Sequence, residues 1–506
     1  MNGLFLQTGY GKVDIVHEIH FMAKKTEASQ LKVSSEIGTL RRLLVHSPDS
    51  GLGKVVPSKA QDWLFEDIVH LETIRRQEYD YYTKVLLYFL DPAKVKGKLK
   101  KIDDPKSKRN FYKPGHADFF KSDKVVELQW LLAEILQTHE TKLKLVASVC
   151  ALEGVAYDEQ MRMMELEPDR LAKLFISGTS DENEMLFAPI PNFIFTRDIG
   201  IVINNHVLLN KPAKQARTRE ALLAKYIFFN HPLFAAYRDN ILEIPEKHHH
   251  FLNPKEGGER KVTLEGGDVM VVSKDHLLIG VSERTSWEAA HQAINLLFEK
   301  KVVKKVTVVK IPKKRDYMHI DTVFTQVKRN VWVMLGNFSK KAVKRLDEDP
   351  VERILEGSPK KDEKISLIQF NLKHIDKPVI FNNLEELLED ISKNDLGCKE
   401  KVKFIYSGNN EFPYDAREQW TDSCNLLALK EGVVLGYDRN DKTVEAFKAA
   451  GFSVVHVADL LQAFEAGSAS PEQLKDTFIL MPSAELSRAR GGFHCMSMPL
   501  LRDELG

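Results

Sequence analysis

Cysteine is scarce in this chain of 506 residues, which contains only Cys150, Cys398, Cys424 and Cys495. The four are widely spaced and form no CxxC pair, which excludes a disulfide framework and a cysteine-based metal knuckle. We therefore expect a cytoplasmic protein with reduced thiols. A free thiol in such a protein is either a buried apolar side chain or a nucleophile.

Long apolar runs and an excess of one charge are missing too. No segment approaches the roughly 20 apolar residues that span a bilayer, and residues 1–25 lack the basic-then-apolar pattern of a secretory signal. The formal net charge is +1, so no overall field attracts nucleic acid or an anionic membrane. The composition is that of a globular protein, and the length predicts one large domain with an appendage or several domains.

Residues 62–178 carry the pattern of helices. Apolar residues recur at helical spacing, and one polar stretch, Lys94–Lys113, interrupts them. This stretch is basic but has no regularly interleaved aromatic residues, so we interpret it as a solvated insertion and not as a nucleic-acid site. The sequence predicts an inserted helical-bundle domain over 62–178 and a catalytic α/β domain formed by 1–61 and 179–506.

The chain after residue 192 repeats one unit of strand, turn, strand, helix and strand. Four such units begin near residues 192, 262, 319 and 425. Supersecondary units that repeat in this way stack or close radially. The early strand at 38–49 and the last segment could complete a further unit, which would bring Cys495 close to the beginning of the chain.

A polar or nucleophilic residue falls at a matching place in successive units. We place these residues at the ends of the opening strands and in the closing segment, as Asp198, Glu265, His319-x-Asp321 and Cys495. Alternate residues of a strand share a face, so His319 and Asp321 should point the same way. If equivalent positions converge on one axis, three carboxylates, one imidazole and one thiol share a pocket.

Such a pocket suits a planar, positively charged ligand. Clustered carboxylates favour a cation, and each edge of a guanidinium can donate paired hydrogen bonds to a carboxylate. A deprotonated thiol would attack the central carbon, and the imidazole would protonate the departing ammonia. Water activated by the same imidazole would then hydrolyse the covalent amidino-cysteine.

Each residue also has an ordinary explanation when it is taken alone. A single cysteine is more often buried than catalytic, and Asp198 could pair with the adjacent Arg197. The segment Glu265–Asp268 contains two glycines that suit a turn. The matching placement in successive units favours a site over these alternatives.

The sequence resembles the arginine deiminase family of guanidine-modifying enzymes. The motifs that carry the resemblance follow the family's order across nearly the whole chain: EIGTLRRLLVHSPD, LFEDIVHLE, PNFIFTRD, LEGGDVM, IGVSERTS, HIDTVF, REQWTDSCNLLAL, GVVLGYDRN and ARGGFHCMSMPL. The resemblance implies the pentein fold, a five-bladed pseudo-symmetric α/β propeller. It also implies hydrolysis of free L-arginine to L-citrulline and ammonia, with no metal or organic cofactor.

The resemblance assigns roles to the residues of the predicted pocket. Cys495 would be the nucleophile, His319 the general acid and base, and Glu265 its partner near the substrate. Asp198 and Asp321 would bind the guanidinium.

Further residues would hold the amino-acid end of arginine. The predicted substrate-binding residues are Asn192, Arg217, Arg284, Arg490 and Asp268. A pocket of acids needs cations for the α-carboxylate of the substrate, and arginine binds a carboxylate with two hydrogen bonds. Taken alone, each arginine would be a solvated surface residue. The presence of the whole set favours a free amino acid over a protein side chain.

Three histidine or length features have no role in this assignment. His494 adjoins the nucleophile but is a less suitable base than His319, because adjacent strand residues point to opposite faces. The triple histidine His248–His250 is interpreted as a solvated loop and not as a metal site, because consecutive residues point to different faces. The chain is longer than usual for the family, with basic insertions that leave the pocket intact but bear on assembly. We expect a homo-oligomer, a dimer or a tetramer.

Three other functions stay open at this point. A related guanidine-modifying enzyme, either an amidinotransferase or a dimethylarginine hydrolase, would use a similar pocket. A metal-dependent hydrolase would take its ligands from His319, Asp321, Asp198 and Glu265 and would leave the thiol without a role. A non-catalytic arginine-binding regulatory protein would bind arginine without turnover.

Overall fold

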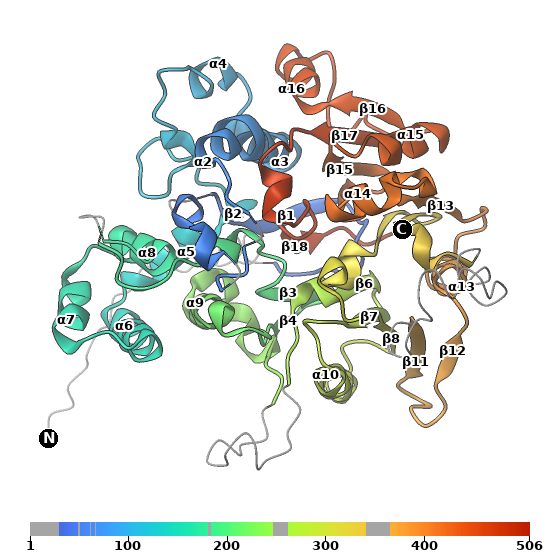
Figure 1. Cartoon of the computed structure of the whole chain (residues 1–506), viewed down its shortest axis with the longest axis horizontal. Helices are drawn as coiled ribbons and strands as arrows, with labels where there is room; N and C mark the ends of the chain where they lie inside the picture. Colours follow the sequence, from blue (N-terminus) through green and yellow to red (C-terminus); the bar gives the residue numbers. More distant parts are fainter. Residues whose placement is uncertain are drawn as a thin grey trace, which may run out of the picture.

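The computed structural model describes residues 30–48, 51–60, 62–65, 67–180, 184–245, 262–340 and 365–506. Within these ranges the strands form five sheets, and Figure 1 shows most helices at the periphery. Each sheet contains an antiparallel pair of strands, one of which also pairs in parallel with a third strand. The same pattern of strand pairing therefore recurs in all five sheets, although β1 and β18 of one sheet come from opposite ends of the chain.

Neighbouring strands of each sheet are joined by backbone hydrogen bonds. The first sheet contains β3 (Gly200–Ile203), β4 (His206–Leu209) and β5 (Ile241–Leu242). The second contains β6 (Val269–Ser273), β7 (His276–Val281), β8 (Lys305–Lys310), β11 (Ser366–Asn371) and β12 (Val379–Phe381). The third contains β9 (Phe324–Lys328), β10 (Val331–Met334) and β13 (Lys403–Tyr406). The fourth contains β14 (Leu427–Lys430), β15 (Val433–Tyr437), β17 (Thr477–Met481) and β16 (Ser453–His456). The fifth contains β18 (Met498–Arg502), β1 (Leu40–Val45) and β2 (Val125–Glu127).

Helices fall into two groups along the chain. Those before residue 178 are α2 (Leu71–Thr73), α3 (Asp80–Leu90), α4 (Leu99–Ile102), α5 (Leu128–Leu136), α6 (His139–Glu153), α7 (Tyr157–Glu165) and α8 (Pro168–Ser177). Those between strands are α9 (Thr218–Asn230), α10 (Trp287–Glu299), α13 (Leu384–Asp390), α14 (Tyr414–Trp420), α15 (Asp441–Ala449) and α16 (Val457–Ala466). The expected cap of α10 is confirmed, because the Ser286 side chain accepts a hydrogen bond from the Ala289 amide. None of the helices in the described ranges has the length and apolar composition needed to cross a membrane.

The two ends of the described chain meet in the fifth sheet. In the antiparallel pairing of β1 with β18, Leu43 lies opposite Pro499 and Leu44 opposite Met498. This pairing confirms the expectation that the early strand and the last segment complete a unit. It brings the loop that carries Cys495 to the first strand, across almost the whole length of the sequence.

Residues 62–178 are mainly helical, but the expected pattern is wrong at one place. The strand β2 interrupts the helices and pairs in parallel with β1 at the edge of the sheet, where Val125 and Val126 are β-branched, buried residues that suit a strand. The helices on its two sides pack differently. α3 shares its core with Leu435 and Phe464, whereas α5 and α8 share theirs with residues of α9 and α10.

The basic stretch Lys94–Lys113 is partly a solvated insertion, as expected. Most of its lysines are exposed. Arg109 is the exception, because it is buried and donates hydrogen bonds to the buried carboxylate of Asp80 at 3.0 and 3.1 Å. His248–His250 lie outside the described residues.

Two helix ends provide a test of the packing around α8. Gly178 ends α8 and Gly154 ends α6, both in the left-handed conformation (φ 69° and 70°). A Cβ at Gly178 would lie 2.0 Å from the carbonyl oxygen of Phe187, whereas one at Gly154 would meet no atom within 4 Å. Gly154→Ala should lower the free energy of unfolding by about 1 kcal/mol, the cost of the left-handed backbone alone.

Gly178→Ala should lower the free energy of unfolding by about 3 kcal/mol, because backbone must also shift. Urea unfolding followed by circular dichroism measures both variants against the wild type. Equal losses for the two alanine variants would show that the contact with Phe187 does not constrain this end of α8.

Candidate active site

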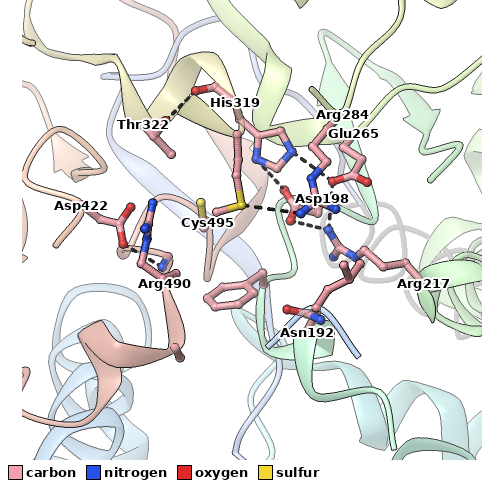
Figure 2. A pocket seen from close by; sticks show the side chains of 15 residues that line it. Asn192, Asp198, Arg217, Glu265, Arg284, His319, Thr322, Asp422, Arg490 and Cys495 are labelled. Carbon is pink, nitrogen blue, oxygen red and sulfur yellow. Dashed lines mark hydrogen bonds and ion pairs between the residues drawn. The ribbon is translucent and has the colours of Figure 1, made fainter. Parts of the chain in front are cut away.

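One pocket collects most of the residues predicted from the sequence (Figure 2). Eight of the ten predicted residues line it: Asn192, Asp198, Arg217, Glu265, Arg284, His319, Arg490 and Cys495. All eight side chains are buried. Asp321 and Asp268 do not line the pocket.

The reactive residues lie before the first strand of their units and not at the end of it. Asp198 precedes β3, Glu265 precedes β6, His319 precedes β9 and Cys495 precedes β18. The expected position at the end of an opening strand is therefore wrong. Short 3-10 turns, Gly266–Asp268 and Ile320–Thr322, separate two of these residues from their strands. The expectation of equivalent places holds, because four sheets each direct one loop toward the same pocket.

The thiol of Cys495 is held by an amide and a carboxylate. The Cys495 amide donates to Asn425 Oδ1 at 3.0 Å, and Asn425 Nδ2 lies 3.1 Å from the sulfur. The thiol lies 3.4 Å from Asp321 Oδ2. Burial, followed by the negative charges of Asp321, Asp198 and Asp422, raises the pKa of the thiol well above its usual value. Without a bound cation, the thiol of Cys495 is therefore protonated at neutral pH.

The imidazole of His319 has the opposite electrostatic environment. Its Nε2 lies 3.0 Å from Glu265 Oε2, and its Nδ1 lies 3.9 Å from Asp198 Oδ1. Burial disfavours the charged ring, but the charge of Asp198 and the hydrogen bond to Glu265 outweigh it and raise the pKa of His319 to about 10. The ring is therefore an imidazolium at neutral pH and is ready to donate a proton to a leaving group.

Asp321 does not share a face with His319, which corrects the expectation of strand alternation. The two residues flank the start of a 3-10 turn, where period-two alternation does not apply. Asp321 turns behind the nucleophile, where its Oδ2 lies 2.9 Å from His494 Nδ1. His494 Nε2 lies 3.2 Å from Glu36. His494 is thus held between two carboxylates outside the pocket lining, in agreement with the preference for His319 as the base.

Asp268 does not line the pocket but binds the turn that follows His319. Its carboxylate accepts hydrogen bonds from the Ser282 hydroxyl at 2.6 Å and from the Ile320 amide at 3.0 Å. Because Ile320 follows His319, this contact fixes the turn that carries the imidazole. The prediction of a substrate-binding role for Asp268 is therefore corrected to a role in positioning His319.

Arg217 lies among the acids at one side of the pocket. Its Nη1 donates to Asp198 Oδ2 at 2.7 Å and to Glu265 Oε2 at 3.1 Å, and its Nε donates to Glu220 Oε2 at 2.9 Å. In this structure, Arg217 neutralises carboxylates and does not present a free edge to an anion. Glu220 was missed by sequence reasoning, although its place three residues after Arg217 at the start of α9 is a signal for such a pair. Burial raises the pKa of Glu220 to about 7.

Two other arginines present nitrogen atoms to the pocket. Among the described residues, Arg490 Nε and Nη1 and Arg284 Nε have no hydrogen-bond partner, and all three atoms are buried. Buried guanidinium groups without partners favour an anionic ligand. Asn192 lines the pocket with them.

Asp422 is a lining residue that sequence reasoning missed. It precedes β14 in the fourth sheet, the same place that Asp198, Glu265 and His319 occupy in their own sheets. Its Oδ2 accepts a hydrogen bond from the Gly491 amide at 2.8 Å. The motif REQWTDSCNLLAL contains this residue, so applying the positional argument to the fourth unit would have found it.

The alternative of a metal site does not fit the residues that would form it. Ligand atoms of Asp198, Glu265 and His319 lie within 4.8 Å of one another. The guanidinium of Arg217 already donates to both carboxylates.

The fold and the pocket define an α/β protein with a buried cysteine, histidine and carboxylate site. A sequence model of the family described as arginine deiminase matches residues 124–502. The arginine deiminase of Borrelia recurrentis (strain A1) is 30% identical over 489 residues, which cover 94% of this chain and 98% of that protein. The arginine deiminase of Staphylococcus aureus (strain JH9) is 28% identical over 489 residues, with 94% and 99% covered. Among solved structures, the amidinotransferase SxtG from Microseira wollei aligns with a TM-score of 0.44 at 12% identity, covering 94% of this chain and 98% of that one.

The chain belongs to the arginine deiminase family.

The charge around the thiol gives a direct prediction. In a Cys398→Ser background, which removes the partly exposed thiol, Asp321→Asn should lower the pKa of Cys495, because one of the nearby negative charges is gone. Alkylation of Cys495 by iodoacetamide at pH 8 should become about tenfold faster. Peptide mass spectrometry measures the modification at this residue.

Asp376→Asn serves as the control, because Asp376 is exposed and does not line the pocket. A rate that is unchanged in Asp321→Asn, or that rises equally in the control, would contradict this explanation of the raised pKa.

Proposed function

We propose that this protein is an arginine deiminase, which hydrolyses free L-arginine to L-citrulline and ammonia through a covalent amidino-cysteine. The observation that carries the proposal is one pocket lined by a thiol, an imidazolium, carboxylates and two arginines, Arg284 and Arg490, that keep buried nitrogens without hydrogen-bond partners in the described residues. This combination of groups suits a molecule with a guanidinium at one end and a carboxylate at the other. Membership of the arginine deiminase family supports the same activity.

The bound substrate would supply the charge that activates the nucleophile. A guanidinium placed between Cys495 and Asp198 adds a positive charge where carboxylates now raise the pKa of the thiol, so the pKa falls. Asp198 Oδ1 has no hydrogen-bond partner within the described ranges and is available to the guanidinium. The thiol proton leaves toward solvent or toward Asp321 Oδ2, the carboxylate oxygen 3.4 Å away.

Two chemical steps follow from this arrangement. The thiolate of Cys495 adds to the guanidinium carbon, and His319 donates a proton to the terminal nitrogen, which leaves as ammonia. The neutral imidazole then takes a proton from water, whose oxygen adds to the carbon of the amidino-cysteine. Collapse of this adduct breaks the carbon–sulfur bond, releases L-citrulline and restores the thiol and the imidazolium. Arg284 and Arg490 would hold the α-carboxylate throughout, with Asn192 nearby.

Related enzymes differ from a deiminase in the molecule that attacks the amidino-cysteine, or in the nitrogen group that leaves in the first step. An amidinotransferase passes the amidino group to an amine, and a dimethylarginine hydrolase accepts N-methyl groups. The family match and the full-length relatives favour the deiminase over both. Assays of citrulline and ammonia with arginine, with acceptor amines and with methylated arginines separate the three. A regulatory protein without catalysis is disfavoured by the complete set of reactive groups in the pocket.

We infer that the five sheets close into a five-bladed α/β propeller of the pentein type, with residues 62–178 as an inserted, mainly helical domain in 1–61 and 179–506. Five sheets of the same design and the pairing of β1 with β18 support this architecture. Assembly into a homo-oligomer, either a dimer or a tetramer, and a cytoplasmic location stay predictions.

Replacing the nucleophile tests the proposal. Cys495→Ala should reduce the formation of citrulline from L-arginine by about 10⁴-fold or more, because the covalent step is lost. Cys398→Ala should keep normal turnover, because Cys398 is partly exposed and does not line the pocket. Normal turnover by Cys495→Ala would disprove the assignment of the nucleophile. Absence of citrulline from the wild type would disprove the proposed function itself.

A further inference from the structure

The segment 420–425, WTDSCN, holds the loop of the nucleophile at successive points. Asn425 binds both the amide and the sulfur of Cys495, and Asp422 accepts the amide hydrogen of Gly491. These contacts hold Gly491 and Cys495 but do not involve the side chain of Arg490. That side chain points into the pocket in Figure 2.

Trp420 is the residue that contacts the guanidinium of Arg490. The central carbon of this guanidinium lies 3.8 Å from the centroid of the Trp420 ring. Arg490 is only 4% exposed, and neither its Nε nor its Nη1 has a hydrogen-bond partner within the described residues. Its backbone adopts φ 58° and ψ 94°, a conformation that non-glycine residues rarely adopt. The stack on Trp420 is therefore a contact that orients a side chain of which two buried nitrogens have no hydrogen-bond partner in the described residues.

The geometry of the stack leaves the guanidinium available to an anion. The π electrons of an indole face attract a cation. Stacking covers one flat face of the guanidinium, while its N–H groups, which lie in the plane of the group, can still donate hydrogen bonds. A carboxylate binds to such an edge with two parallel hydrogen bonds. Trp420 itself does not line the pocket, and its side chain is half-exposed at the end of α14.

We propose that Trp420 is a positioning residue for substrate binding, which holds Arg490 so that its free edge receives the α-carboxylate of the substrate. This inference rests on the proposed function, because it takes a free amino acid as the ligand. Trp420 acts on the amino-acid end of the substrate and not on the carbon under attack. Its loss should therefore weaken the binding of substrates that carry the carboxylate and leave the chemical step almost unchanged.

Steady-state kinetics of Trp420→Leu and Trp420→Phe test this role. Trp420→Leu should raise KM for L-arginine about tenfold, because the cation–π contact that fixes Arg490 is lost. The value of kcat should stay within about twofold of the wild type. Trp420→Phe should restore most of the affinity, since a smaller aromatic face still accepts the guanidinium.

Agmatine separates a positioning role from a general structural one. It has the guanidinium and the carbon chain of arginine but no carboxylate, so its inhibition constant against L-arginine should be the same in the wild type and in Trp420→Leu. Trp130→Leu is the matched control, because Trp130 also contacts a cation, Lys121 at 4.8 Å, but does not line the pocket. This control should leave KM for L-arginine unchanged.

Two results would overturn the proposal while the proposed function stands. The first is an unchanged KM for L-arginine in Trp420→Leu, which would show that Arg490 needs no stacking partner. The second is an equal weakening of agmatine and L-arginine together with a fall in kcat, which would show a merely structural role for Trp420. Absence of arginine turnover in the wild type would instead overturn the proposed function, and this inference with it.

Discussion

Negative charge gathered around a buried thiol is the constraint on which the rest of the site depends. Asp198, Glu265 and Asp321 lie with the thiol in the protein interior, where like charges cannot accumulate without compensation. His319 is held as an imidazolium by two of these acids, and Arg217 donates hydrogen bonds to the same two. Burial, followed by the negative charges of Asp321, Asp198 and Asp422, raises the pKa of the thiol and keeps it protonated. Under the proposed function, a bound guanidinium would lower this pKa, so that binding of the substrate and activation of Cys495 would be the same event.

The fold can maintain this charge because each group comes from a different sheet. Asp198, Glu265, His319 and Cys495 lie on loops before β3, β6, β9 and β18, and every loop is anchored by the strand that follows it. No short segment could form the site by itself, and the pairing of β1 with β18 completes it. Stacked sheets resist the movement of a single loop, which keeps buried charges at the distances that balance them.

Much of this arrangement could be predicted from the sequence, because the units repeat and their unusual residues fall at matching places. The repeated unit and the convergence of Asp198, Glu265, His319 and Cys495 on one pocket followed from that pattern. The family, and the placement of Asn192, Arg217, Arg284 and Arg490 in the same pocket, followed from the resemblance of the motifs. The predictions that were wrong concerned residues whose side-chain direction depends on local backbone geometry. The 3-10 turn after His319 cancelled the alternation that would have turned Asp321 toward the pocket, and Asp268 proved to hold that turn. The stack of Arg490 on Trp420 depends on side-chain directions, which a residue pattern does not encode.

The covalent intermediate on Cys495 is the central claim, and mass spectrometry tests it most directly. His319→Gln should slow both steps, because it lacks the acid for the departing ammonia and the base for the attacking water, so it is examined beside the wild type quenched during turnover. After mixing with L-arginine and quenching in acid, the account predicts an added mass equal to arginine less ammonia, located on the peptide that contains Cys495. Citrulline formation by the wild type without such an adduct in either protein, or an adduct on another residue, would contradict the account.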